Sequence, residues 1–139
     1  MPEPDTILIV DDDPDFVAAA RTILEGIGYR VVAAGVEDEG FAVARSERPG
    51  LILLDLMMEE TDSGVRLAHR LRSDPDTRGI PIVILTGVRR ATGFDFRPLT
   101  AEDYEWIAAD AWLEKPVGPR QLADLARRML PEGRGETSS

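Results

Sequence analysis

The chain contains no cysteine, so disulfide bonds and thiolate metal sites are excluded. It has no apolar run long enough to span a bilayer, and its start, Met-Pro-Glu-Pro-Asp, lacks the basic and apolar regions of a signal peptide. Basic residues are few, 16 Lys or Arg against 26 Asp or Glu, which gives a net charge of −10. Such a charge disfavours binding to nucleic acid or anionic lipid. We therefore expect a cytoplasmic protein that contacts neither DNA nor membrane directly.

What is present indicates one globular domain. The chain has 139 residues, of which 43% are hydrophobic and 30% charged, which is ordinary for a folded domain with a real core. Residues 131–139 are Pro, Gly, Arg, Glu, Thr and Ser. This composition cannot bury enough apolar surface to fold. We expect a domain over residues 1–130 and a disordered tail over residues 131–139.

Short apolar runs predict five β-strands, at residues 6–10, 29–33, 51–55, 81–85 and 111–114. The runs at 6–10, 51–55 and 81–85 are almost continuously apolar rather than alternating, which is typical of strands buried on both faces of a parallel sheet. Residues with helical periodicity lie between them. The alternation of strand and helix predicts an α/β fold, a doubly wound parallel sheet with helices on both faces.

The first helix has the clearest boundaries. Asp13 followed by Pro14 is a helix-start signal, with a capping carboxylate and proline in the first turn. Gly26 and Gly28 indicate its end. Further helices are expected at 37–46, from 62, at 101–108 and from 118. The residues expected on the inner face of the first helix are Phe16, Ala19, Ala20, Ile23, Leu24 and Ile27.

Four of the predicted strands end in polar residues: Asp11 with Asp12, then Asp55, Thr86 and Lys115. Parallel strands bring these ends to one edge of the sheet, where ligands bind in open α/β folds. Carboxylates so close would repel one another unless a cation neutralised them. Oxygen ligands without His or Cys favour Mg²⁺. The ammonium and hydroxyl groups suit a phosphoryl group, and Asp55 is the natural nucleophile for an aspartyl-phosphate.

With these motifs the sequence resembles the receiver domain of bacterial response regulators of the chemotaxis-regulator-like group. The matching pieces are Ile-Val-Asp11-Asp12, Leu-Leu-Asp55, Leu-Thr86-Gly87 and Glu-Lys115-Pro116, in order and each at a predicted strand end. The resemblance implies a flavodoxin-like fold with strand order 2-1-3-4-5. That order makes the first and third strands neighbours and brings their aspartates together.

The resemblance also implies individual roles. Asp55 would be the phosphoacceptor, Asp12 a direct Mg²⁺ ligand, and Asp11 a ligand acting more through water. The backbone carbonyl of Met57 would be another Mg²⁺ ligand. The remaining implied roles are a phosphoryl hydrogen bond from Thr86, a phosphoryl ion pair from Lys115, a cis Lys115–Pro116 peptide, and an aromatic switch at Trp112.

The leading functional hypothesis is a single-domain response regulator in a two-component phosphorelay. A sensor histidine kinase or phosphotransfer protein would donate to Asp55, and the signal would pass by protein–protein contact to an unknown downstream protein. The chain would catalyse only its own phosphorylation and dephosphorylation, and a homodimer is possible. The segment from Val88 to Ala109 departs most from the family, because the span between Thr86 and Lys115 is several residues longer than usual.

Two other classes compete with this hypothesis. One is a receiver-like scaffold that no longer uses phosphorylation, motivated by the altered loop after Met58 and by the segment from Val88 to Ala109. The other is a Mg²⁺-dependent phosphohydrolase of the haloacid-dehalogenase type. Its Asp-x-Asp-x-Thr/Val pattern is broken here by Asp15, and no cap insertion is present.

One expectation concerns the lifetime of the phosphoryl group. The residues two positions after Asp55 and Thr86 are Met57 and Val88, both apolar. Neither can hydrogen-bond an attacking water well. We predict slow autodephosphorylation.

Overall fold

The computed structural model describes residues 5–56, 63–86 and 109–130. The predicted loop at 57–61, helix at 101–108 and tail at 131–139 lie outside the described residues. The elements, in chain order, are β1 (Thr6–Val10), α1 (Pro14–Gly26), β2 (Arg30–Ala34), α2 (Glu37–Glu47), β3 (Leu51–Asp55), α3 (Ser63–Ser73), β4 (Ile82–Thr86), β5 (Ala111–Glu114) and α5 (Pro119–Met129).

The five strands form one parallel sheet in the order β2-β1-β3-β4-β5. This confirms the predicted fold class and strand order. Residues of β1 pair with β2 on one side and with β3 on the other, so that Val10 lies opposite both Ala34 and Leu54. Asp11, which directly follows β1, and Asp55, which ends β3, therefore lie side by side at the same edge of the sheet.

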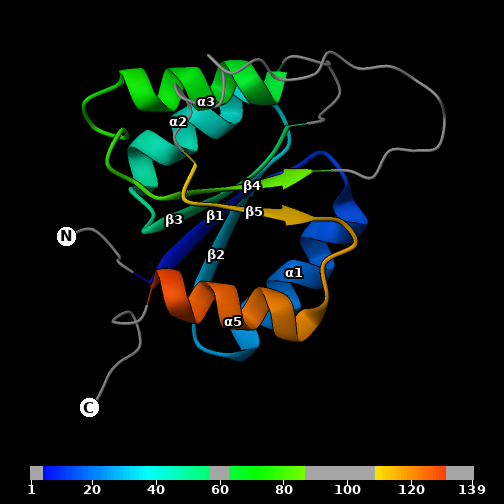
Figure 1. Cartoon of the computed structure of the whole chain (residues 1–139). Coiled ribbons are helices and arrows are strands. Elements are labelled where there is room, and N and C mark those ends of the chain that lie inside the picture. The colour runs from blue at the N-terminus through cyan, green and yellow to red at the C-terminus, as the bar shows by residue number, and fades with distance from the viewer. Residues whose placement is uncertain (1–4, 57–62, 87–108, 131–139) are drawn as a thin grey trace, which may run out of the picture.

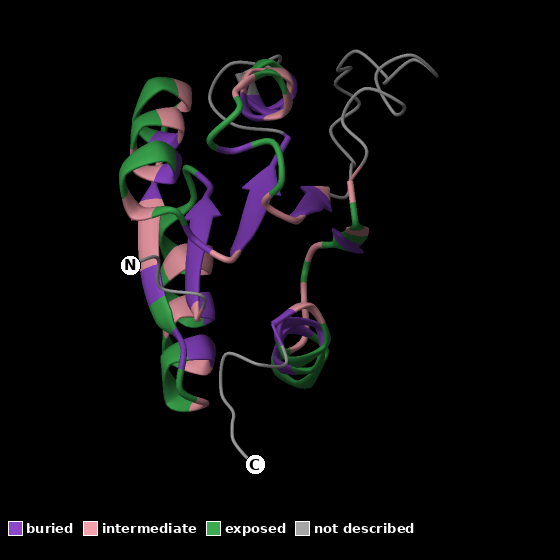
Figure 2. Cartoon of the chain, turned by 90° about the vertical axis from the view of Figure 1, so that its left-hand side faces the viewer, coloured by how far each residue is buried: buried purple, intermediate pink, exposed green. Residues whose placement is uncertain are grey.

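Helices cover both faces of the sheet (Figure 1), with α2 and α3 on one face and α1 and α5 on the other. Each face has its own apolar cluster, one built around Ile9, Leu53 and Leu85, and the other around Leu8, Ile52 and Ile84. The three central strands, β1, β3 and β4, are buried almost throughout, whereas the edge strands β2 and β5 are only partly buried. The helices are exposed on their outer faces (Figure 2). Burial on both faces explains why the central strands consist almost entirely of apolar residues.

Helix α1 begins as the sequence predicts. The side chain of Asp13 accepts a hydrogen bond from the backbone N–H of Asp15 at 3.0 Å, and Pro14 occupies the first helical position. The inner face differs from the prediction at one residue. Ala19 is exposed, and Val17 packs against the core cluster instead.

Two strands begin one residue later than predicted. Tyr29 donates its backbone N–H to the carbonyl of Leu24, so it closes the end of α1, and β2 begins at Arg30. Pro81 has no N–H for the sheet, and β4 begins at Ile82. Among the described residues, no helix is long and apolar enough to cross a membrane.

Candidate functional site

The carboxyl edge of the sheet collects the polar residues that the sequence placed at strand ends. Asp55 is the last residue of β3 and Thr86 the last of β4, while Asp11 directly follows β1 and Lys115 directly follows β5. Backbone hydrogen bonds extend the strand pairing to these residues. The N–H of Asp11 donates to the carbonyl of Ala34, and the N–H of Lys115 to the carbonyl of Thr86. The sheet itself therefore fixes where each side chain starts.

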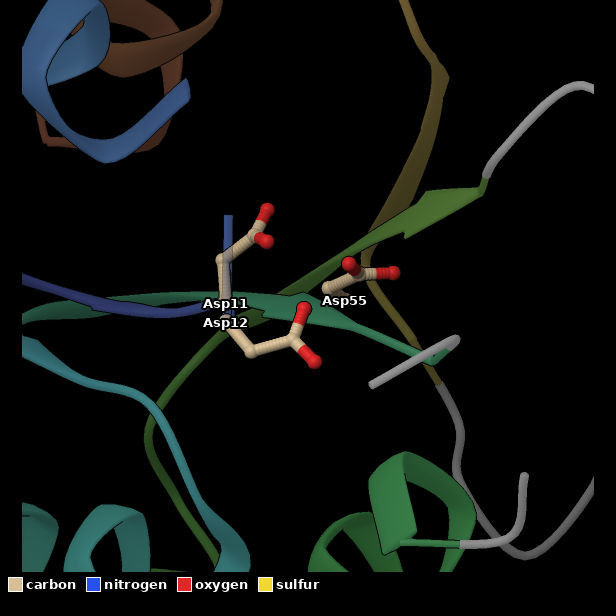
Figure 3. A group of neighbouring side chains, drawn as sticks. All are labelled: Asp11, Asp12 and Asp55. Carbon is tan, nitrogen blue, oxygen red and sulfur yellow. The ribbon is translucent and has the colours of Figure 1, made fainter. Parts of the chain in front are cut away.

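Asp11, Asp12 and Asp55 form a compact carboxylate group (Figure 3). One oxygen from each of the three side chains lies within 4.8 Å of the other two. Asp11 and Asp55 are buried, whereas Asp12 is exposed. Three carboxylates so arranged on a rigid sheet edge provide a set of oxygen ligands for a hard divalent cation.

The ammonium of Lys115 lies against two of these carboxylates. Its Nζ is 2.7 Å from Oδ2 of Asp11 and 3.2 Å from Oδ2 of Asp55, to which it donates a hydrogen bond. The third face of the ammonium is covered by Phe16, whose ring centroid lies 4.6 Å from Nζ. Lys115 thus joins the ends of β1, β3 and β5 to the first turn of α1.

Burial and charge compete at Asp11. Burial is the largest effect and raises the pKa of Asp11, the contact with the Lys115 ammonium lowers it, and the negative charge of Asp55 raises it, so that the pKa is about 6. For Lys115, burial alone would lower the pKa, but the contact with Asp11 and the charges of Asp55 and Asp11 outweigh it and raise the pKa. The ammonium therefore stays charged at neutral pH and partly neutralises the carboxylates.

The residues fit a bound cation. Oδ2 of Asp11 is buried and makes no hydrogen bond of good geometry to any described residue, although the Lys115 ammonium is in contact with it. Oδ1 of the same carboxylate is held by the backbone N–H of Asp13 at 2.9 Å. An oriented carboxylate whose buried oxygen is in ion-pair contact with the Lys115 ammonium, beside two further carboxylates, can accept a metal ion without rearranging the backbone.

Thr86 and Trp112 lie on the neighbouring strands. The hydroxyl of Thr86 donates a long hydrogen bond of 3.4 Å to the carbonyl of Leu113, and the side chain is partly buried. Trp112 lies on β5 opposite Ile84 and is 39% exposed. The peptide between Lys115 and Pro116 is cis, as the resemblance implies. Met57, whose carbonyl was expected to bind Mg²⁺, lies outside the described residues.

Two residues at the site were not expected from the sequence. Phe16 was predicted only as a core-facing residue of α1, and its ring contact with Lys115 has no signal in the helical pattern. Gly64 lies in the first turn of α3, and a Cβ built there would be 2.5 Å from the carbonyl oxygen of Asp55 and 2.4 Å from Cα of Leu56. Only a glycine lets α3 approach the end of β3 this closely.

Comparison with known proteins identifies the class of protein. The family model of the response regulator receiver domain matches residues 7–127. The chain belongs to this family. It is similar to a CheY-like receiver domain protein from Methanospirillum hungatei, with a TM-score of 0.74, 29% sequence identity, and coverage of 93% of this chain and 95% of that one.

Particular relatives are regulators of transcription and signalling. The chain is 36% identical over 125 residues to the phosphate regulon transcriptional regulatory protein PhoB of Pseudomonas aeruginosa, covering 90% of this chain and 51% of PhoB. It is 31% identical over 131 residues to the response regulator Rre1 of Synechocystis, covering 94% of this chain and 53% of Rre1. The chain therefore spans about half the length of these curated relatives.

Proposed function

We propose that this receiver domain, residues 1–130, is switched by phosphorylation of Asp55 in a Mg²⁺-dependent reaction. The donor is a sensor histidine kinase or a phosphotransfer protein. The observation that carries the proposal is the convergence of three carboxylates within 4.8 Å of one another with an ammonium 3.2 Å from Asp55. A scaffold that did not use phosphorylation would gain nothing from this costly concentration of charge.

The chemistry is an in-line displacement at phosphorus. A carboxylate oxygen of Asp55 attacks the phosphoryl group of the donor phosphohistidine, the new P–O bond forms, and the P–N bond breaks with its electron pair staying on the imidazole. Phosphoryl transfer needs positioning and charge neutralisation more than proton transfer. Asp55 is fixed for this role because it ends a buried strand that is paired on both sides.

Asp12 and Asp11 are the ligands that we assign to Mg²⁺, together with Asp55 and the carbonyl of Met57. When bound, the ion supplies charge neutralisation at the phosphoryl oxygens. Lys115 binds a phosphoryl oxygen, for which its ammonium moves only from one acceptor to another beside the carboxylate group. Thr86 exchanges its long bond with Leu113 for a hydrogen bond to the phosphoryl group.

Signalling follows from that exchange. When Thr86 turns toward a phosphoryl group, its side-chain hydrogen bond to the carbonyl of Leu113 is released, which biases the neighbouring Trp112 toward a second arrangement. The output is protein–protein contact by this domain. The net charge of −10 supports a role in which the domain itself does not touch DNA, even though relatives such as RpaA of Synechocystis are named as DNA-binding regulators.

The decisive experiment is the intact-protein mass after treatment with acetyl phosphate and Mg²⁺. We expect the wild type to gain one phosphoryl group and Asp55→Asn to gain none. An adduct of equal yield in Asp55→Asn, or no adduct in the wild type, would refute the proposal. Beryllium fluoride with Mg²⁺ should also change the tryptophan fluorescence, and Trp112→Phe assigns that change, because Trp106 is the only other tryptophan.

A further inference from the structure

Lys115 is the only lysine in the chain; every other basic side chain except His69 is an arginine. Its side chain is 19% exposed, and its ammonium is surrounded by Asp11, Asp55 and the ring of Phe16. Phe16 comes from α1 and packs against the apolar cluster beneath α1 and α5. The ring is therefore held by the core on one side and covers the ammonium on the other.

The ring differs from the two carboxylates in one respect that matters for function. A bound cation or a phosphoryl group on Asp55 competes with Lys115 for the carboxylate oxygens, so both ion pairs weaken when the site is loaded. The face of an aromatic ring attracts an ammonium but offers no ligand to a hard cation. The ammonium therefore keeps its contact with Phe16 when a cation or a phosphoryl group weakens its contacts with Asp11 and Asp55.

A lysine without such a contact would be poorly placed. Its side chain has four flexible methylenes and a strongly hydrated ammonium. When the ion pairs with the carboxylates weaken, such an ammonium tends to move into solvent. Phe16 opposes this departure, since its ring lies 4.6 Å from Nζ, within the range of a cation–π interaction. The ring shields the ammonium from water at the point where its charge is needed.

We propose that Phe16 is a positioning residue, which holds the Lys115 ammonium beside the carboxylate group so that it can reach a phosphoryl group on Asp55. The proposal rests on the function proposed above, which it deepens. Phe16 acts through Lys115 and does not itself contact the reacting atoms.

The single lysine allows a direct test by NMR, because ¹³C-lysine labelling gives one set of side-chain signals that needs no assignment. In the wild type we expect the Lys115 side-chain protons nearest the ring to be shifted upfield of the free amino acid. Phe16→Leu, which keeps the apolar packing, should remove this shift and speed the side-chain motion seen in relaxation. Phe16→Tyr should restore both.

The matched control is Phe41→Leu. Phe41 also lies beneath a cation, with the guanidinium carbon of Arg70 4.3 Å from its ring centroid, but it packs on the opposite face of the sheet. This change removes a ring and its cation–π contacts with Arg70 and Arg45 without altering the surroundings of Lys115. Its lysine signals should match those of the wild type.

The functional measurement is the initial rate of phosphorylation by acetyl phosphate at fixed Mg²⁺. We expect Phe16→Leu to be slower by about threefold to tenfold, which is the factor that a cation–π contact of about 1 kcal/mol gives. Phe16→Tyr should recover most of the rate, and Phe41→Leu should lose none. In a Lys115→Met background, Phe16→Leu should have no further effect.

The outcomes separate this proposal from the one it rests on. Unshifted lysine signals in the wild type, or unchanged relaxation in Phe16→Leu, would overturn the positioning role whether or not the protein is phosphorylated. So would a wild-type rate in Phe16→Leu, or an equal loss of rate in the Lys115→Met background. A wild type that takes up no phosphoryl group refutes the proposed function, and the NMR comparison then decides alone whether the ring holds the lysine.

Discussion

The ammonium of Lys115 lies closer to Asp11, at 2.7 Å, than to Asp55, at 3.2 Å. Lys115 was expected from the family resemblance to pair with a phosphoryl group on Asp55. It is also in contact with the buried oxygen of Asp11, the carboxylate that we propose as a Mg²⁺ ligand. A metal ion bound there would compete with the ammonium for the same carboxylate.

This competition predicts the effect of Lys115→Met. Removing the ammonium leaves Asp11 and Asp55 without their cation, so we expect Mg²⁺ to bind severalfold more tightly by isothermal titration calorimetry. Phosphorylation by acetyl phosphate should nevertheless become slower, because no ammonium remains to bind the phosphoryl oxygens. Arg30→Met removes one positive charge from an exposed ion pair with Glu47 and should change neither quantity. Weaker Mg²⁺ binding in Lys115→Met would contradict the competition.

Gly64 sets the distance between α3 and the end of β3 at Asp55. Gly64→Ala places a methyl group 2.5 Å from the Asp55 carbonyl oxygen, where backbone rather than a flexible side chain must move. We expect a loss of about 1–3 kcal/mol in unfolding free energy, as for other overpacked sites, measured by urea denaturation. The displaced end of β3 should also slow phosphorylation.

Gly26→Ala is the matched control for this substitution. Gly26 ends α1, and a Cβ built there meets nothing within 4 Å. Alanine at this position should raise the unfolding free energy by about 0.5 kcal/mol, because it reduces the freedom of the unfolded chain. Equal effects of the two substitutions would show that the close approach at Gly64 is unimportant.

The strand order was predicted from the family resemblance, whereas the sequence pattern alone was sufficient to predict the parallel sheet and the polar residues at its edge. Apolar runs that stop at Asp11, Asp55, Thr86 and Lys115 contain that information, because parallel strands must end at a common edge. The sequence was insufficient for contacts that depend on the distance between packed elements. The clash that Gly64 avoids belongs to this class, and so does the position of Phe16 over the ammonium.

The error at Ala19 has a related cause. Helical periodicity admitted a broad inner face for α1, and only the packing against the sheet shows that Val17 lies on that face and Ala19 outside it. Two strands begin one residue later than predicted for local reasons, such as the hydrogen bond from the backbone N–H of Tyr29 to the carbonyl of Leu24 in α1. The assigned roles of the site residues remain predictions, since they concern a loaded site.

Asp12 and Asp13 are adjacent in sequence but differ in the structure. Asp12 belongs to the carboxylate group, whereas the side chain of Asp13 caps α1. Asp13→Ala should cost about 1 kcal/mol of unfolding free energy and leave Mg²⁺ affinity unchanged. Asp12→Ala should weaken Mg²⁺ binding at least tenfold with little effect on the stability of the metal-free protein. Calorimetry measures the Mg²⁺ affinity of both variants, and urea denaturation measures their unfolding free energy. Loss of Mg²⁺ binding in Asp13→Ala would contradict the separate roles of the two residues.

The apolar side chains of Met57 and Val88 predict a long lifetime for a phosphoryl group on Asp55. Both residues lie outside the described residues, so this prediction rests on their chemistry alone. Hydrolysis breaks the bond between phosphorus and the Asp55 oxygen after attack by an aligned water. Side chains that hydrogen-bond this water speed the reaction. We expect Met57→Asn with Val88→Glu to accelerate phosphate loss severalfold, measured by the decay of the phosphorylated mass after the donor is removed. Met57→Leu with Val88→Ile keeps both positions apolar and should decay like the wild type; an unchanged rate in the polar variant would refute the idea.

The pKa of Asp11 predicts how pH acts on the metal-free protein. Burial raises this pKa from 3.8 to about 6 in the folded state, so between about pH 4 and pH 6 the folded protein binds more protons at Asp11 than the unfolded chain does. The contribution of Asp11 to stability is therefore largest below this window and is lost as the pH rises through it. Thermal unfolding in EDTA should show the loss, and Asp11→Asn should show a flatter profile over the same range.

Magnesium should reverse this loss. Carboxylate ligands must be deprotonated to bind a metal ion, so Mg²⁺ affinity should rise as Asp11 ionises through about pH 6. We expect Mg²⁺ to raise the unfolding temperature more at pH 7.5 than at pH 5, and binding near pH 6 to release protons, which calorimetry in buffers of different ionisation enthalpy measures. Asp13→Asn changes a carboxylate outside the metal group and should keep the pH dependence. A stabilisation by Mg²⁺ that did not vary with pH would show that Asp11 is not the group that links Mg²⁺ binding to proton binding.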